Sequence, residues 1–199
     1  MPPLQLLIKP ASSLCNLKCS YCFYADEAQN RRIPCYGVMQ EDTLACVIRK
    51  ALAQAEDVCT FGFQGGEPTL AGLPFFEKVV ALERRYNTRN LSITHTIQTN
   101  GMVLDDAWAT FLAREHFLVG LSLDGYAALH DLHRVDAQGN GTHARVLEAA
   151  ALLARHHVET NILTVVTAQT ARAPERLYRF FERQGLRYQQ YIPCLPPLH

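Results

Sequence analysis

Three cysteines lie in one short run near the start of the chain. Cys15, Cys19 and Cys22 stand in the segment Cys-Asn-Leu-Lys-Cys-Ser-Tyr-Cys, directly after a short apolar segment. Three thiolates gathered by one loop can hold an iron–sulfur cluster, and because a cubane cluster ordinarily takes four protein sulfurs, three leave one iron open for chemistry. The alternatives are a zinc loop or a set of buried structural cysteines. Zinc sites more often combine a Cys-x-x-Cys with a second Cys or His pair, so the spacing favours the cluster.

Four further cysteines lie outside this loop. Cys46 falls on the apolar face of a predicted helix and Cys59 opens a predicted strand, so we expect both to fill the core. The sequence around Cys35 and Cys194 indicates no role for either residue. The total of seven cysteines is odd and unevenly spaced, and the amino terminus does not resemble a signal peptide, which disfavours a disulfide framework.

Short apolar segments alternate with amphipathic ones along the chain. Helices are expected over 41–56 and 144–156, around Trp108 with Asp105 or Asp106 as its cap, and after Pro74 and Pro174. Strands are expected over 4–8, 58–63, 91–98, 117–123, 158–166 and 186–192. This alternation predicts an α/β fold in which roughly six parallel strands and five crossover helices form most of an open, TIM-like (β/α) barrel.

The polar motifs follow the predicted strands. The cysteine loop follows the first strand, Gly65-Gly66-Glu67-Pro68 the second and Thr99-Asn100-Gly101 the third, while Ser122-Leu123-Asp124-Gly125 ends the fourth and Cys194-Leu195 follows the sixth. In (β/α) barrels the working residues collect on loops at the carboxyl ends of the strands. We therefore expect these motifs to converge on one rim.

Composition narrows the class of protein. Acidic and basic side chains balance to a formal charge of zero, so no net field gathers nucleic acid or an anionic membrane. A length of 199 residues with 48% hydrophobic side chains suits one large globular domain. No apolar run is long enough to span a bilayer, so we expect a cytoplasmic protein with neither a nucleic acid nor a membrane as partner.

Together these motifs resemble the radical S-adenosyl-L-methionine (SAM) superfamily, and within it the anaerobic sulfatase-maturating enzymes. The likeness is carried by residues 6–13, 15–24, 63–72 and 98–101 and runs nearly end to end. It implies a 4Fe-4S cluster held by Cys15, Cys19 and Cys22, whose open iron takes the amino and carboxylate groups of S-adenosyl-L-methionine. Reductive cleavage of that cofactor gives a 5′-deoxyadenosyl radical, which abstracts hydrogen from the substrate.

The same resemblance places five residues against S-adenosyl-L-methionine. Tyr21 would face the adenine, or else only pack the loop, and Gly66, lacking a Cβ, would bring its carbonyl to the ligand ammonium. Ser122 would bond the ribose hydroxyls, although a strand-end serine more often makes turn contacts. Arg134 would hold the methionine carboxylate with its planar fork, the alternative being a surface ion pair with Asp131 or Asp136. Leu195 would offer backbone groups to the adenine, on the resemblance alone.

The sequence allows two roles for Glu67. Its carboxylate could lie near the ammonium of the cofactor, or it could cap the following turn. Tyr24 and Gln64 are expected on the same rim, near the substrate.

The histidine pairs His130/His133 and His156/His157 are not assigned as metal ligands. His156 and His157 end a predicted helix, where positive charge is favourable, and no neighbouring cysteines or carboxylates complete a set of ligands.

The resemblance also sets an expectation for domain organisation. The related enzymes continue into a cysteine-rich auxiliary-cluster (SPASM) extension and a region with a catalytic aspartate, neither of which this sequence contains. Residues 1–199 are thus expected to be the radical SAM core domain, cut before its last helix, with the catalytic base beyond residue 199.

The expected activity is oxidation of a cysteine or serine of a sulfatase to Cα-formylglycine. Its partners would be a sulfatase polypeptide and an electron donor such as ferredoxin or flavodoxin. The alternatives are another radical peptide modification, such as thioether formation, or a remnant that binds the cluster and cofactor without turnover.

Overall fold

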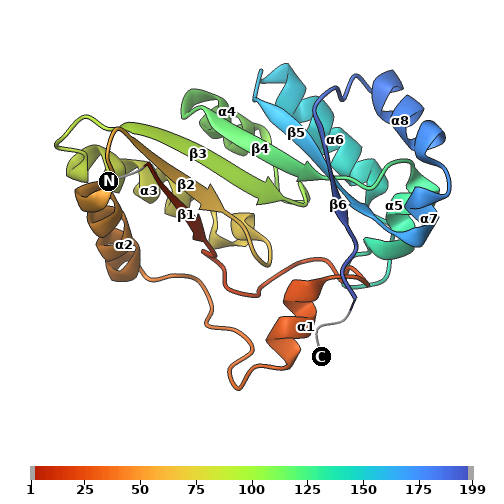
Figure 1. Ribbon diagram of the computed structural model, residues 1–199, viewed down its shortest axis with the longest axis horizontal. Helices are drawn as coiled ribbons and strands as arrows, with labels where there is room; N and C mark the ends of the chain where they lie inside the picture. The colour runs from red at the N-terminus through yellow and green to blue at the C-terminus, as the bar shows by residue number, and fades with distance from the viewer. Residues whose placement is uncertain (1–2, 197–199) are drawn as a thin grey trace.

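Six parallel strands form the single sheet of the protein. The structure is a computed structural model that describes residues 3–196. The strands follow one another across the sheet in chain order, and the sheet curls into a half-barrel (Figure 1). The strands are β1 (Leu4–Ile8), β2 (Val58–Phe63), β3 (Ser92–Thr99), β4 (Phe117–Ser122), β5 (Thr160–Val166) and β6 (Gln189–Pro193). The predicted partial (β/α) barrel is confirmed.

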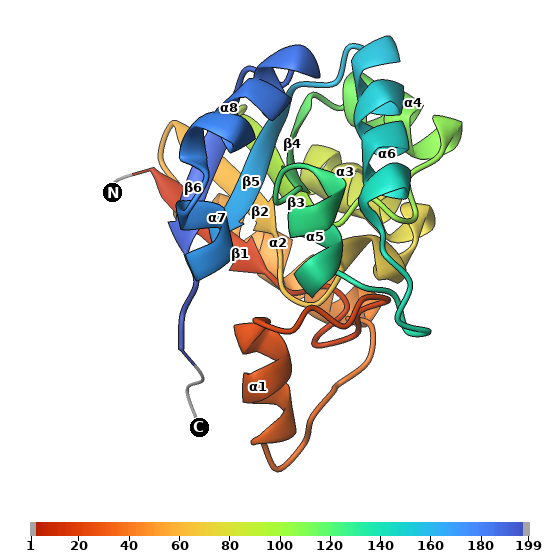
Figure 2. The same cartoon turned by 90° about the vertical axis from the view of Figure 1, so that its right-hand side faces the viewer.

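Helices cover the convex face of this sheet, while its concave face stays open (Figure 2). Asp105 caps α4 by accepting a hydrogen bond from the Trp108 N–H, and Pro74 and Pro174 lie in the first turns of their helices, as expected. The helices are α1 (Phe23–Gln29), α2 (Glu41–Gln54), the 3₁₀ turn η1 (Pro68–Ala71), α3 (Leu73–Tyr86), α4 (Asp106–Arg114), α5 (Ala127–His133), α6 (His143–Arg155), α7 (Ala168–Ala171) and α8 (Pro174–Arg183).

The short helices α1, α5 and α7 were not expected from the sequence. Helix α1 buries only Ala28, and a helix with no apolar stripe leaves no periodic signal. It stands away from the sheet beyond the carboxyl end of β1, with the segment after β6 beside it (Figure 1; Figure 2).

Two hydrophobic clusters hold the helices to the sheet. The larger lies under β1 to β4 and contains the packed rings of Phe63, Phe76, Trp108 and Phe117. The smaller packs β4 and β5 against α5, α6 and α8. The larger cluster contains Cys59, as predicted.

The prediction that Cys46 fills the core is wrong, because its side chain is only half-buried. Leu44 and Ile48 form the buried face of α2, and a residue two positions from each points to the other side of a helix.

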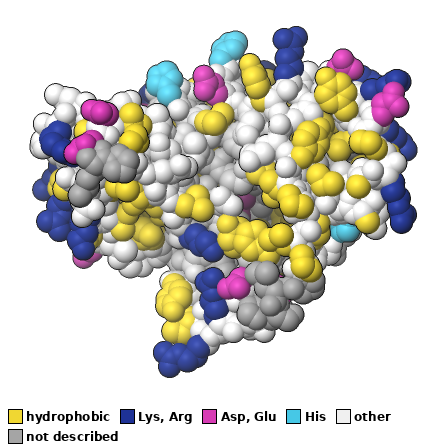
Figure 3. All heavy atoms as spheres, viewed as in Figure 1, with side chains coloured by type: hydrophobic (Ala, Val, Ile, Leu, Met, Phe, Trp, Pro, Cys, Tyr) yellow, Lys and Arg dark blue, Asp and Glu magenta, His cyan; other side chains and the backbone are white. Residues whose placement is uncertain are grey.

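The open face of the half-barrel carries both polar and hydrophobic side chains. The hydroxyls of Thr60 and Thr94 bond across β2 and β3 at 2.7 Å. Figure 3 shows hydrophobic side chains across the middle of this face, with Lys and Arg side chains beside them at the centre as well as at the left and right margins. No helix within residues 3–196 is long and apolar enough to cross a membrane.

Candidate active site

One cavity at the carboxyl ends of the strands gathers the residues that the sequence singled out. Its volume is about 180 Å³. A second cavity of about 560 Å³ shares part of this wall and extends between α1, α7 and the end of β6. The lining of the first cavity includes every residue expected to hold the cluster or its cofactor, namely Cys15, Cys19, Tyr21, Cys22, Gly66, Ser122, Arg134 and Leu195. The predicted convergence on one rim is therefore confirmed.

The cysteine loop is held in place by the segment that ends α5. The Lys18 N–H donates to the Val135 carbonyl at 2.8 Å, and the Ser20 N–H donates to the His133 carbonyl at 3.0 Å. The Ser20 hydroxyl also bonds His133 Nδ1 at 2.7 Å. Residues far apart in the chain thus fix the backbone that carries the three thiols.

The chemistry of the three thiols fits an iron–sulfur cluster. Soft sulfur donors are what such clusters require, and Cys15, Cys19 and Cys22 all line one cavity. Within residues 3–196 no three Cys, His, Asp or Glu side chains already stand together as a set of metal ligands. Burial raises the pKa of Cys15 and raises that of Cys19 to about 11, which favours the neutral form of these two thiols. Cluster binding by these thiols is therefore coupled to loss of their protons.

Glu67 is a cap and not a free carboxylate. It is 1% exposed, and its carboxylate accepts hydrogen bonds from the Thr69 N–H at 3.0 Å, the Thr69 and Thr99 hydroxyls at 2.7 Å, and the Asn100 N–H at 2.7 Å. Its own N–H donates to the Leu14 carbonyl. Burial raises the pKa of Glu67, while these donors oppose the shift. Of the two roles considered from the sequence, the structure supports the cap. The carboxylate joins the turn after β2 to the end of β3, and the Glu67 N–H bonds the loop after β1.

Position 66 must be a glycine because residues 12–14 lie against its backbone. Its φ is +51°, and a Cβ at this position would lie 2.4 Å from the Leu14 carbonyl oxygen and 3.0 Å from that of Ser12. The contact that excludes a side chain is therefore the backbone just before Cys15. Gly66 lets the cysteine loop lie directly on the loop after β2.

Arg134 is buried, and its partner is neither of the aspartates that the sequence suggested. Its Nε and Nη2 donate to Asp124 at 2.8 and 3.3 Å. Asp131 instead accepts from the His143 N–H, and Asp136 accepts from the backbone and side chain of Asn140. The alternative of a surface ion pair is thus wrong. In the sequence, Asp124 belongs to the motif at the end of the fourth strand, and nothing there indicates its role.

The family of the chain follows from comparison with known proteins. The radical SAM superfamily domain matches residues 10–181, which is most of the chain. This protein belongs to the radical SAM superfamily. The cofactors of this superfamily are a 4Fe-4S cluster and S-adenosyl-L-methionine.

Several curated relatives are similar to this radical SAM chain over its whole length. A cysteine-type anaerobic sulfatase-maturating enzyme from Clostridium perfringens is 49% identical over 100% of the chain and 54% of its own length. A serine-type anaerobic sulfatase-maturating enzyme from Klebsiella aerogenes is 37% identical over 97% of the chain and 47% of its own length. The radical SAM chain therefore spans about half the length of the curated relatives it matches.

Solved structures agree with the fold of the radical SAM chain. Native anSMEcpe with bound AdoMet is 49% identical, with a TM-score of 0.95 over 98% of this chain and 53% of that one. Another structure shows anSMEcpe with bound AdoMet and the Cp18Cys peptide, at 48% identity and a TM-score of 0.93 over 99% of this chain and 52% of that one. Streptococcus suis SuiB, at 21% identity and a TM-score of 0.72 over 98% of this chain and 41% of that one, shares the fold.

The remaining residues of the radical SAM site lie on both sides of the first cavity. Gln64 donates from Nε2 to the Tyr24 hydroxyl at 2.8 Å, and both side chains line this cavity. Leu195 is 48% exposed and lines both cavities, while Cys194 lines only the second. The Cys194 N–H donates to the Val166 carbonyl at 3.0 Å, which extends the pairing of β5 and β6 into the rim.

A glutamine on β3 positions Ser122 in the radical SAM site. Gln98 Nε2 donates to Ser122 Oγ at 2.9 Å, and Gln98 lies beside Gly120 in the register of β3 and β4. A Cβ at Gly120 would lie 2.1 Å from Gln98 Oε1. The absence of a side chain at Gly120 thus gives Gln98 room to reach Ser122.

We expect Gly120→Ala to weaken binding of S-adenosyl-L-methionine about tenfold, roughly the loss of one good hydrogen bond. The new methyl group meets the flexible end of Gln98, so this side chain turns away and Ser122 loses its partner while the fold survives. Titration of the reconstituted protein measures the affinity, and thermal unfolding checks the fold. Gly139→Ala is the control, because no atom lies within 4 Å of a Cβ there, although its φ of +88° strains the loop. Unchanged affinity in Gly120→Ala would show that Gln98 does not position Ser122.

Proposed function

We propose that this chain is the radical-generating part of an anaerobic sulfatase-maturating enzyme, which oxidises a cysteine or serine of a sulfatase to Cα-formylglycine. The observation that carries the proposal is the likeness to the cysteine-type enzymes, which extends over the whole chain. The rim supports it, because one cavity holds three thiols, a buried cation and strand-end polar groups. The catalytic base is proposed to lie outside this chain.

The cofactor roles in this proposal follow the positions of the side chains. Cys15, Cys19 and Cys22 hold the cluster, and the bound cluster with its cofactor supplies the hydrogen-abstracting radical. The other residues bind and orient the cofactor, as expected from the sequence: Tyr21 and Leu195 at the adenine, Ser122 at the ribose, Gly66 at the ammonium and Arg134 at the carboxylate. Because Asp124 occupies the Nε edge of Arg134, the Nη1 end of the guanidinium is the part offered to the ligand.

The proposed substrate is a polypeptide. A related structure contains a bound peptide, and the second cavity gives the rim an open wall between α1, α7 and the end of β6. Tyr24 and Gln64 are proposed to lie near that peptide. A low-potential electron donor such as ferredoxin or flavodoxin is proposed to reduce the cluster.

Mass spectrometry on a short peptide tests the proposal. This chain is joined to the remaining part of the cysteine-type Clostridium perfringens enzyme, so that a catalytic base is supplied. The joined protein is reconstituted anaerobically and incubated with S-adenosyl-L-methionine, a strong reductant and a peptide containing Cys-x-Pro-x-Arg. We expect the thiol of the cysteine to be replaced by an aldehyde, and a peptide with alanine in place of that cysteine to stay unchanged.

The other outcomes each contradict the proposal in a distinct way. A product lighter by two hydrogens that retains its sulfur would indicate thioether formation. An unmodified peptide beside continued release of 5′-deoxyadenosine would indicate that this chain handles the cofactor without maturing the peptide.

A further inference from the structure

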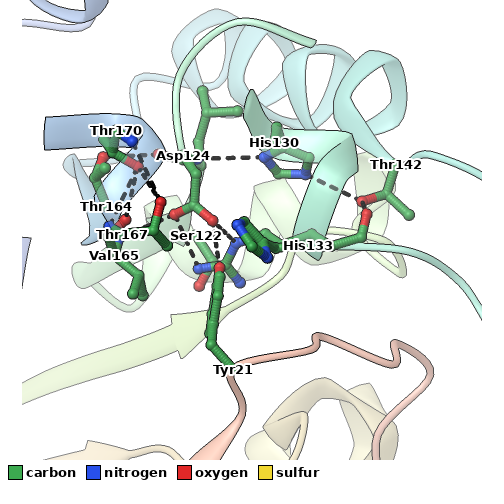
Figure 4. A network of polar contacts seen from close by, with 12 residues as sticks. Tyr21, Ser122, Asp124, His130, His133, Thr142, Thr164, Val165, Thr167 and Thr170 are labelled. Carbon is green, nitrogen blue, oxygen red and sulfur yellow. Dashed lines mark hydrogen bonds and ion pairs between the residues drawn. The ribbon is translucent and has the colours of Figure 1, made fainter. Parts of the chain in front are cut away.

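The carboxylate of Asp124 is the meeting point of three chain segments (Figure 4). Asp124 follows β4 and is 2% exposed. Its Oδ2 accepts from the Tyr21 hydroxyl in the cysteine loop and from Arg134 Nε at the end of α5. Its Oδ1 accepts from the Val165 N–H on β5 at 2.9 Å and from Arg134 Nη2. One side chain therefore joins the cysteine loop, α5 and the sheet.

Two of these donors, Tyr21 and Arg134, line the first cavity. The guanidinium of Arg134 lies over the Tyr21 ring, 5.4 Å from its centre. Both side chains are largely removed from water, and a buried guanidinium needs a counter-charge with good hydrogen-bond geometry. Asp124 supplies that charge and at the same time fixes which end of the guanidinium faces the cavity.

A second layer of hydrogen bonds holds the backbones of Asp124 and Arg134, and Figure 4 shows the His130 and Thr142 side chains that form it. The Asp124 N–H donates to His130 Nδ1 at 3.3 Å, so the neutral ring carries its proton on Nε2, which lies 3.0 Å from the Thr142 hydroxyl. That hydroxyl donates to the Arg134 carbonyl at 2.9 Å. Burial lowers the pKa of His130 to about 4, which keeps the ring neutral near pH 7. Both members of the ion pair are thus fixed at their backbones.

We propose that Asp124 is a positioning residue of the cofactor site, which aims Arg134 at the carboxylate of S-adenosyl-L-methionine and holds Tyr21 against the nucleoside. The inference rests on the proposed roles of Arg134 and Tyr21 and does not depend on the identity of the peptide substrate. If Asp124 only stabilised the fold, its substitution would weaken the binding of ligands with and without the carboxylate to the same extent. Asp124 acts through Arg134, so its loss falls mainly on ligands that carry the carboxylate.

The test compares two ligands in the reconstituted protein. S-adenosylhomocysteine carries the amino acid carboxylate, and 5′-methylthioadenosine lacks it. Asp124→Asn keeps the side-chain volume but turns an amide N–H towards donors, so Arg134 loses its fixed orientation. We expect the dissociation constant for S-adenosylhomocysteine to rise about tenfold or more. The dissociation constant for 5′-methylthioadenosine should change less than about threefold, because this ligand lacks the carboxylate and depends on Asp124 only through Tyr21.

Two checks of integrity, a control variant and a double variant complete the test. Iron and sulfide content and thermal unfolding report the cluster and the fold independently of binding. Asp131→Asn is the matched control. Asp131 lies on α5, which ends just before Arg134, but its carboxylate accepts from the His143 N–H, so this variant should bind both ligands like the parent protein. In Arg134→Gln, adding Asp124→Asn should cost little further affinity, since the two residues act as one unit.

Equal weakening for both ligands, or additive losses in the double variant, would overturn the proposal and leave Asp124 a structural residue. If Asp124→Asn does not fold, Tyr21→Phe replaces it, since it removes one bond to Asp124 and leaves the ion pair intact. We then expect a modest and equal loss for both ligands with normal iron content, and a loss confined to S-adenosylhomocysteine would contradict the scheme. These binding data are independent of the peptide assay, so failure of formylglycine formation leaves this inference standing.

Discussion

Cys19→Ala will abolish the cleavage of S-adenosyl-L-methionine to 5′-deoxyadenosine. Cys19 is the middle thiol of the loop in the sequence, lines both cavities and is one of the three proposed cluster ligands. Two thiols cannot hold a cubane cluster with one open iron, and without that cluster no electron reaches the sulfonium. We expect a loss of at least about a hundredfold, because removing a required ligand removes the cofactor and not just one contact.

Chromatography of the nucleoside product after anaerobic incubation with a strong reductant measures this effect. Iron and sulfide per chain should fall in the same variant. Cys46→Ala is the matched control, since this thiol lies on α2, away from the rim, and is not part of either cavity lining. Cleavage by Cys19→Ala at the rate of Cys46→Ala would contradict the cluster assignment.

Glu67→Ala will lower the free energy of unfolding by about 2–5 kcal/mol. The substitution leaves the buried N–H groups of Thr69 and Asn100 without their acceptor, and each unsatisfied buried donor costs about 1–3 kcal/mol. Glu67→Gln should fall between the two proteins, because one amide oxygen can still accept while the amide nitrogen faces a donor. Chemical denaturation of the protein without its cofactors gives the free energies directly.

Glu77→Ala provides the comparison for this measurement. Glu77 is an exposed residue of α3, and surface substitutions of this kind change stability by about 0.5 kcal/mol or less. A Glu67→Ala protein as stable as Glu77→Ala would show that water replaces the lost acceptor and that the Glu67 carboxylate does not hold the turn after β2 to the end of β3.

The sequence predicted the order of strands and helices because each buried strand and long helix carries its own local pattern. Helix α2 is an example, since Leu44, Ile48 and Leu52 repeat at helical spacing and are all buried. The limits of elements were less well predicted: the fifth strand begins at Thr160 instead of Val158, after His157 adopts a positive φ of 56° in the turn that ends α6. A turn conformation of this kind leaves no periodic trace in the sequence.

The rim was predictable for a different reason. Parallel strands with crossover helices place all their carboxyl ends at one edge, so residues that follow different strands must meet. The three cysteines, Gly66 and Ser122 could therefore be assigned to one cavity before any contact between them was known.

By itself, the sequence determined that three thiols share one loop, that the fold is a half-barrel and that the strand-end motifs meet. Only the tertiary structure decided which partners those motifs take. Arg134 pairs with Asp124 instead of its nearer aspartates, Gln98 reaches Ser122 across Gly120, and Glu67 joins three loops. The physical reason is that these bonds depend on strand register and on burial, which bring together side chains that are distant in the chain and give buried charges few choices of partner.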